Sequence, residues 1–236
     1  MPTLKEHFKS SWIQVLPEEI RSEFRSKMSS IDLKNGQVLY SKGDFLAGIY
    51  EIRSGSIKLS AFGFNGNEMV LNICHPPTII GDLYVITNSK SLFTATSMAK
   101  SELGILPRES FDQLRAKYPA VNELLLKAAS YRQFWLYQFL QDLSVLDIEA
   151  RLAGRLRDLA FSMGEKISDG AFKLALKQDD LANMLGVTRQ TVNQLLKRWE
   201  EAEIIELVYR GVKIRDIGRL IALADSNRES SKPQGL

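Results

Sequence analysis

The spacing of hydrophobic residues changes along the chain, and each change predicts a different kind of structure. Residues 8–30 carry large apolar side chains at helical intervals on both sides of Pro17, which favours short helices. From residue 35 the pattern becomes short β-rich runs broken by glycine, and beyond residue 107 it becomes helical again. The sequence therefore predicts an α+β protein with a β-rich first half and a helical second half.

Turn-forming pairs punctuate the β-rich part at Asn35-Gly36, Gly43-Asp44, Ser54-Gly55 and Asn65-Gly66. Before the last of these, Ile57, Leu59 and Ala61 alternate with polar residues, and apolar residues resume after it, which is typical of a β-hairpin. We expect further strands at 93–99 and 102–106. Together these runs predict an antiparallel β-roll, or jelly roll, within residues 1–118.

A long helix is expected over residues 119–144, after a shorter helix that begins near Pro107. Because its apolar residues cover two sides, the long helix needs two partners. We expect one partner to be the β-roll and the other to be the same helix of a second subunit; burial within one monomer is the alternative. The two expected stripes are Leu124, Ala128, Tyr131 and Trp135, and Leu125, Ala129, Leu136, Phe139 and Leu143.

A new helix is expected after Asp147, whose carboxylate is a good N-cap, with Leu152, Leu156 and Leu159 on its buried face. The chain changes character here, so we place a domain boundary near 145–147. The predicted parts are a sensor domain, a dimerisation helix with a hinge, a C-terminal domain, and a polar tail that we expect to be flexible: 1–118, 119–146, 147–224 and 225–236.

Composition excludes several classes of protein. The 236 residues are 44% hydrophobic and 25% charged, with a net charge of +3, which is ordinary for a globular protein. The single Cys74 excludes an intrachain disulfide, and one cysteine with two histidines makes no zinc cluster. The N-terminal segment lacks the apolar region of a signal peptide, and no stretch resembles a membrane span, so we expect a cytoplasmic protein without a membrane partner. We expect no metal site, no cofactor and no catalytic residues.

The segment 178–201, QDDLANMLGVTRQTVNQLLKRWEE, is the most informative part of the chain. Gly186 ends a first helix, because glycine tolerates the positive φ of a sharp exit, and Thr188 is suited to cap a second helix. Ala182, Gly186, Val192 and Leu195 follow one another at spacings that match a helix-turn-helix. We therefore expect a recognition helix over residues 189–201 that enters the major groove of duplex DNA.

The second helix has one apolar and one polar face. Its apolar residues are spaced for packing on the domain, whereas the polar face carries side-chain types that read base edges, since Arg pairs with guanine and Asn or Gln with adenine. A plain pair of helices with a polar outer face is the alternative. The expected DNA-contacting residues are Thr188, Arg189, Gln190, Thr191, Asn193, Gln194 and Lys197.

Two short apolar runs follow, at 204–207 and 212–214, on either side of Tyr209-Arg210-Gly211. A β-hairpin after the recognition helix makes a winged helix, in which Arg210 and Lys213 are expected to contact phosphates.

The whole order resembles the CRP/FNR family of bacterial transcription regulators, over roughly residues 15–222, and VTRQTVNQLLKRWEE is its most specific part. The resemblance implies a homodimer, joined through helix 119–144, on an inverted-repeat DNA operator. It also implies an effector site in the β-roll and roll loops that contact RNA polymerase. By the same resemblance Arg189, Gln190 and Gln194 occupy base-reading positions. Many members have Arg-Glu and a later Arg there, so we expect a different operator.

The β-roll departs from the cyclic-nucleotide binders of this fold, which resemble one another in a phosphate cassette of Gly-Glu-Leu and, further on, Arg-Ser-Ala. Ser91 stands where the phosphate-binding arginine is expected, and the adjacent Lys90 is a point charge without the guanidinium fork. The effector is expected to be an unknown small molecule or absent; a cyclic-nucleotide response through a non-standard phosphate pocket is the alternative. The effector-pocket candidates are Gly81, Asp82, Leu83, Lys90, Ser91 and Tyr131.

Other sensing modes and catalysis are poorly supported. An iron–sulfur cluster needs several cysteines, and a thiol switch at Cys74 has no resolving cysteine. Haem on Cys74 and His75, with Pro2 at the N-terminus, is a further alternative, but these residues are typical of a small buried side chain and a loop. A metal-dependent enzyme needs His and carboxylate ligands on adjacent strands, and only His75 lies in the roll, so we expect no enzyme.

Overall fold

The computed structural model describes residues 11–64, 66–167 and 170–226. The chain packs as two units, Met1–Arg132 and Gln133–Leu236, which part within the long helix. A break between helices does occur at Leu146 and Asp147, close to the boundary expected from the sequence, but the packing changes at Arg132. The predicted four-part domain division remains a prediction.

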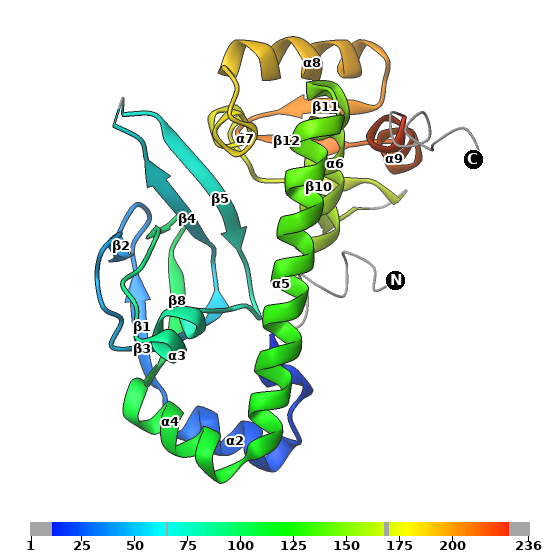
Figure 1. Ribbon diagram of the computed structural model, residues 1–236. Helices are drawn as coiled ribbons and strands as arrows, with labels where there is room; N and C mark the ends of the chain where they lie inside the picture. The colour runs from blue at the N-terminus through cyan, green and yellow to red at the C-terminus, as the bar shows by residue number, and fades with distance from the viewer. Residues whose placement is uncertain (1–10, 65, 168–169, 227–236) are drawn as a thin grey trace, which may run out of the picture. The chain divides into compact units, whose positions relative to one another are not determined.

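The first unit contains a β-roll of two four-stranded antiparallel sheets, as expected from the glycine-punctuated runs (Figure 1). One sheet has the order β1 (Ser29–Leu33), β8 (Ser101–Pro107), β3 (Gly48–Ser54) and β6 (Ile79–Ile80). The other has the order β2 (Val38–Tyr40), β7 (Thr94–Ser97), β4 (Ile57–Phe62) and β5 (Glu68–Cys74). A hydrophobic core contains residues of both sheets, among them Ile49, Ile52, Ile57, Ala95, Leu103 and Leu106.

The β4–β5 hairpin forms where the alternating pattern predicts it, with Ile57 opposite Cys74 and Phe62 opposite Glu68. Its turn contains Gly66 at φ +78°, the left-handed conformation that glycine adopts without strain. A register shift between Leu59 and Ser60 interrupts the alternation, so Ser60 is buried whereas Leu59 is only half-buried.

Short helices accompany the roll. The apolar spacing near Pro17 and Pro107 predicts those at residues 12–26 and 108–117, whereas the sequence did not predict the helix at residues 82–87. These short helices are the 3₁₀ helix η1 (Trp12–Val15), α2 (Glu18–Ser26), α3 (Asp82–Thr87) and α4 (Arg108–Lys117). The Trp12 ring lies 5.7 Å from the Phe24 ring and 6.0 Å from the Phe111 ring, so η1, α2 and α4 share one aromatic cluster.

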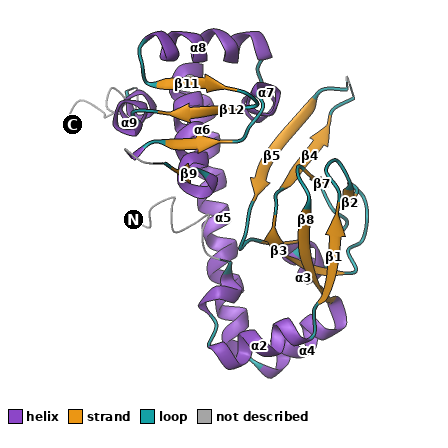
Figure 2. Cartoon of the chain, turned by 180° about the vertical axis from the view of Figure 1, so that it is seen from behind, coloured by secondary structure: helices purple, strands orange, loops and turns teal. Residues whose placement is uncertain are grey.

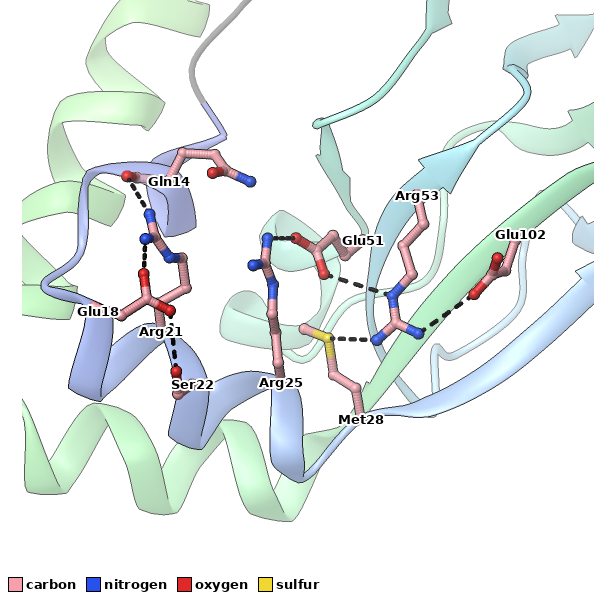
Figure 3. A network of polar contacts seen from close by, with 9 residues as sticks. All are labelled: Gln14, Glu18, Arg21, Ser22, Arg25, Met28, Glu51, Arg53 and Glu102. Atoms are coloured by element: carbon pink, nitrogen blue, oxygen red, sulfur yellow. Dashed lines mark hydrogen bonds and ion pairs between the residues drawn. The ribbon is translucent and has the colours of Figure 1, made fainter.

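A buried carboxylate fastens α2 to the roll (Figure 3). Glu51 of β3 is 2% exposed and accepts a hydrogen bond from Arg25 of α2 at 2.9 Å, while the Arg53 Nε lies 3.8 Å from its other oxygen. Arg53 also lies 3.7 Å from Glu102 of β8. A buried carboxylate is tolerated when it is paired in this way, so the network orders α2, β3 and β8 together.

The long helix α5 (Pro119–Val145) matches the expected 119–144 closely. Its roll-facing side combines residues from both expected stripes, because Val121 and Leu125 are buried while Leu124 and Ala128 pack against the roll core. The expectation that each apolar stripe has its own partner was therefore wrong for this end of the helix. Large apolar side chains remain exposed on α5: Leu126, Tyr131, Phe134, Leu136, Tyr137, Leu140, Leu143 and Val145. Within the described residues, no helix meets the length and apolarity that a bilayer crossing requires.

The second unit contains α6 (Ile148–Met163), which begins as predicted where the Asp147 carboxylate accepts a hydrogen bond from the Ala150 N–H at 2.8 Å. Its remaining helices are α7 (Gln178–Leu185), α8 (Arg189–Glu201) and α9 (Ile217–Asp225). They accompany a sheet of order β11 (Ile205–Val208), β12 (Gly211–Ile214), β10 (Phe172–Leu174) and β9 (Glu165–Lys166), shown in Figure 2. The sequence did not predict β9, β10 or α9. Of the expected tail 225–236, only residues 225 and 226 lie within the described part, and Asp225 closes α9.

Candidate functional site

The turn between α7 and α8 forms as its residues predict. Gly186 adopts φ +68°, and a Cβ there would meet no atom within 4 Å, so the backbone conformation rather than space requires glycine. The Val187 N–H donates to the Ala182 carbonyl at 3.1 Å, and the Thr188 hydroxyl accepts from the Thr191 N–H at 3.1 Å. These local bonds fix the angle at which α8 leaves the turn.

The inner face of α8 is fully packed. Its buried residues are those of the predicted apolar face: Val192, Leu195, Leu196 and Trp199. The Trp199 indole N–H donates to Glu149 of α6 at 2.9 Å, and Arg198 donates to the same carboxylate at 3.1 Å. Because packing and polar contacts both hold this face, rotation of α8 about its axis is restricted and the opposite face stays presented to solvent.

The outer face of α8 carries the expected DNA-contacting residues, of which Arg189, Gln190, Gln194 and Lys197 are exposed. Asn193 is half-buried, and its amide donates to the Gln178 side chain of α7 at 3.0 Å. Arg189 lies 3.5 Å from the Asp179 carboxylate of α7. The sequence did not indicate Gln178 or Asp179 as site residues, because their partners lie on the other helix.

The wing is the β11–β12 hairpin, with Val208 opposite Gly211 and Arg210 at φ +55° in the turn. The Arg210 guanidinium lies 5.7 Å from the Tyr209 ring, which is 91% exposed. Tyr209 was not predicted as a site residue, although an exposed aromatic at a wing tip is a suitable surface for a sugar or base.

A row of charged side chains crosses the sheet from β11 through β12 to β10. Lys213 stands directly opposite Lys173 on one side and Glu206 on the other, and its Nζ lies 3.6 Å from the Glu206 carboxylate. Arg215 also binds Glu206 at 3.0 Å, and these cations hold the pKa of Glu206 below its ordinary value. Two adjacent lysines in register repel one another, which favours an anion next to them.

The effector-pocket candidates are only partly brought together. Gly81 adopts φ +89° at the start of α3, and the next residue, Asp82, is 1% exposed. Both Asp82 oxygens bind Arg132 of α5, at 2.8 and 2.9 Å, in a bidentate ion pair. The sequence did not indicate Arg132 as a pocket residue. It indicated the neighbouring Tyr131, which is 42% exposed.

The second half of the cassette does not form a phosphate site. Ser91 is buried, and its hydroxyl bonds with the Phe93 carbonyl and N–H, while its backbone is held by Gly43 and Asp44. Lys90 is exposed and lies 5.7 Å from the Phe45 ring, and Leu83 is 51% exposed. Ser91 therefore offers a phosphate no charge-assisted contact, and its hydroxyl is already engaged within its own turn.

Three buried tyrosines, Tyr40, Tyr50 and Tyr84, belong to the roll core, and the rings of the first two contact each other in a tilted arrangement with centroids 5.8 Å apart. Burial raises the pKa of all three phenols. The interior of the roll is thus rich in neutral phenol groups, a different chemistry from an anion site.

Cys74 is buried, as expected for a small apolar side chain. Burial lowers the pKa of the adjacent His75 to about 4, so this imidazole is neutral near pH 7. Among the described residues, no group of three or more His, Cys, Asp or Glu side chains is arranged to hold a metal ion.

A capped and packed recognition helix followed by a wing defines a winged helix-turn-helix DNA-binding protein. A Crp-like helix-turn-helix domain model matches residues 150–223, and a cyclic nucleotide-binding domain model matches residues 30–118. The chain belongs to the CRP/FNR family, whose members are transcription regulators rather than enzymes.

Relatives of known function cover most of the chain. It is 27% identical over 197 residues to the anaerobic regulatory protein of Haemophilus influenzae, an alignment that spans 83% of this chain and 76% of that protein. It is 26% identical over 196 residues to a CRP-like cAMP-activated global transcriptional regulator of Mycobacterium tuberculosis, spanning 82% of this chain and 87% of that protein. A CRP/FNR-family regulator from Thermus thermophilus has the same fold, with a TM-score of 0.71, 21% identity, and coverage of 84% of this chain and 100% of that one.

Proposed function

We propose that this protein is a homodimeric, sequence-specific transcription regulator that inserts α8 into the major groove of an inverted-repeat operator. One observation carries the proposal: the inner face of α8 is locked by packing while its outer face presents Arg189, Gln190 and Gln194 to solvent. These side-chain types discriminate bases through their hydrogen-bonding edges.

The exposed apolar side chains of α5 support the dimer. Tyr137, Leu140 and Leu143 are 60%, 51% and 41% exposed, and such a row on one helix is stabilised when the same helix of a second copy covers it. Two recognition helices then reach successive major grooves about 34 Å apart. Such a regulator acts in the bacterial cytoplasm, where the DNA lies. Loops of its β-roll are expected to contact RNA polymerase.

The roll supports control by an effector other than a cyclic nucleotide, or constitutive binding. The M. tuberculosis relative is described as cAMP-activated, but here Ser91 supplies no cation for a cyclic phosphate, and the Arg132 guanidinium is paired with Asp82. A cyclic-nucleotide response remains the second candidate, because Gly81, Asp82 and Leu83 keep the first part of the cassette.

The proposal is tested by selecting bound duplexes from a random DNA pool with purified protein and no added ligand. Enrichment of an inverted repeat is expected. If nothing is enriched, the selection is repeated with cyclic AMP, cyclic GMP and cell extract, and no enrichment under any of these conditions means that the proposed function is wrong. Enrichment that appears only with a cyclic nucleotide would establish the second candidate.

On the selected operator, Lys197→Ala is expected to weaken binding to all sequences alike and to reduce the slope of log affinity against log salt by about 1, because one phosphate contact is lost. Lys127→Ala on α5 removes the same charge elsewhere and is the matched control. An unchanged salt slope in Lys197→Ala would contradict the assigned orientation of α8.

A further inference from the structure

Two side chains in the first turn of α7 contact the outer part of α8. Asp179 lies 3.5 Å from the Nη1 of Arg189, with 55% and 67% of the two side chains exposed. Next to it, Gln178 accepts a hydrogen bond from Asn193 at 3.0 Å. The two helices are therefore linked on the surface that is proposed to face DNA.

The ion pair adds little to the stability of the fold, because exposed pairs in water are screened and lose side-chain entropy. For DNA binding the carboxylate is unfavourable by itself, since it adds a negative charge close to the phosphates. Its physical effect on recognition must therefore act through the arginine that it holds.

A guanidinium has five N–H donors, and a carboxylate at Nη1 leaves donors at Nη2 and Nε available. Those donors suit the bidentate contact to O6 and N7 of guanine. Without a carboxylate beside it, the Arg189 side chain is also suited to bind a DNA phosphate. The Asp179 carboxylate repels a phosphate at that position. The Gln178–Asn193 hydrogen bond keeps the first turn of α7 in place beside α8.

We propose that Asp179 is a specificity-determining positioning residue, which holds Arg189 for base reading and keeps it from binding phosphate. This inference rests on the proposed function and adds a residue of α7 to the recognition surface.

The test measures binding by fluorescence anisotropy to three duplexes. They are the selected operator, the operator variant altered at the one base pair whose identity no longer affects binding by Arg189→Ala, and a duplex of unrelated sequence. In Asp179→Asn the preference for the operator over its variant is expected to fall about tenfold, while binding to unrelated duplex strengthens. Glu201→Gln removes the same charge at the other end of α8 and is expected to leave the preference unchanged.

A double variant separates positioning from a general charge effect. The readout is the preference for the operator over the duplex of unrelated sequence, which Arg189→Ala lowers without abolishing. In an Arg189→Ala background, Asp179→Asn is expected to cause no further loss of this preference, because the residue that it orients is gone. The inference is overturned if Asp179→Asn keeps the wild-type preference, if Glu201→Gln loses as much, or if the two losses add. If the wild-type protein prefers no sequence, the proposed function fails and the inference fails with it. If the wild type and Asp179→Asn discriminate equally between the operator and its altered form, only the inference is overturned.

Discussion

His75 follows the last residue of β5, and its Nε2 is buried without a hydrogen-bond partner among the described residues. Burial disfavours the imidazolium and lowers its pKa from 6.5 to about 4. In the unfolded chain the same side chain accepts a proton near pH 6.5. The residue therefore links the stability of the roll to pH.

The direction of the pH effect follows from proton binding. Between pH 6.5 and 4 the unfolded chain holds a proton on His75 that the folded chain does not. The free energy of unfolding is therefore highest above pH 6.5 and decreases as pH falls toward 4. At pH 5 the loss is about 2 kcal/mol for a shift of this size. Urea unfolding at pH 7.5 and pH 5 should show a smaller pH dependence in His75→Gln than in the wild type. Equal pH dependence in the two proteins would show that His75 is not neutral in the fold.

Among the elements, α3 and α5 are joined by the Asp82–Arg132 ion pair, whose residues lie 50 positions apart. The two sides of the pair differ in exposure, because the Asp82 side chain is 2% exposed and that of Arg132 is 47% exposed. Water can therefore solvate Arg132 when its partner is removed, but it cannot solvate Asp82 to the same extent.

This asymmetry predicts unequal costs for the two substitutions. Arg132→Gln leaves a buried carboxylate unpaired and is expected to destabilise the protein by about 3 kcal/mol at pH 7. Asp82→Asn is expected to cost less, because the remaining guanidinium is half-exposed. Both costs are measured by chemical unfolding at pH 7. Equal costs at pH 7 would contradict this account of the pair.

For the whole molecule, the exposed apolar row on α5 predicts assembly. Leu140→Glu places a charge within that row and is expected to convert a dimer into a monomer, because an uncompensated charge would be buried between the helices. Light scattering coupled to size-exclusion chromatography measures the mass, and operator affinity should fall in parallel. Gln141→Glu adds the same charge at an exposed polar position and is the control. A wild-type mass of one chain would contradict the proposed dimer.

The family and the architecture could be predicted from sequence because the relevant signals are local. Gly186 at positive φ, the Thr188 cap and the buried series from Val192 to Trp199 each depend on neighbours within one or two helical turns. The same applies to the Asp147 cap of α6 and to the glycine turns of the roll. Strands β9 and β10 escaped prediction because they have only two and three residues, too few to show a period.

By itself, then, the sequence determined the succession of β-roll, long helix and winged helix-turn-helix, and the recognition helix with its outward-facing side chains. Only the tertiary structure decided that Asp82 belongs with Arg132, that Asp179 and Gln178 meet Arg189 and Asn193, and which residues of α5 face the roll. The physical reason is that caps and periodicity depend on short stretches of backbone. Pairings between distant residues instead depend on which side chains packing brings within hydrogen-bonding distance, and no local pattern encodes that choice.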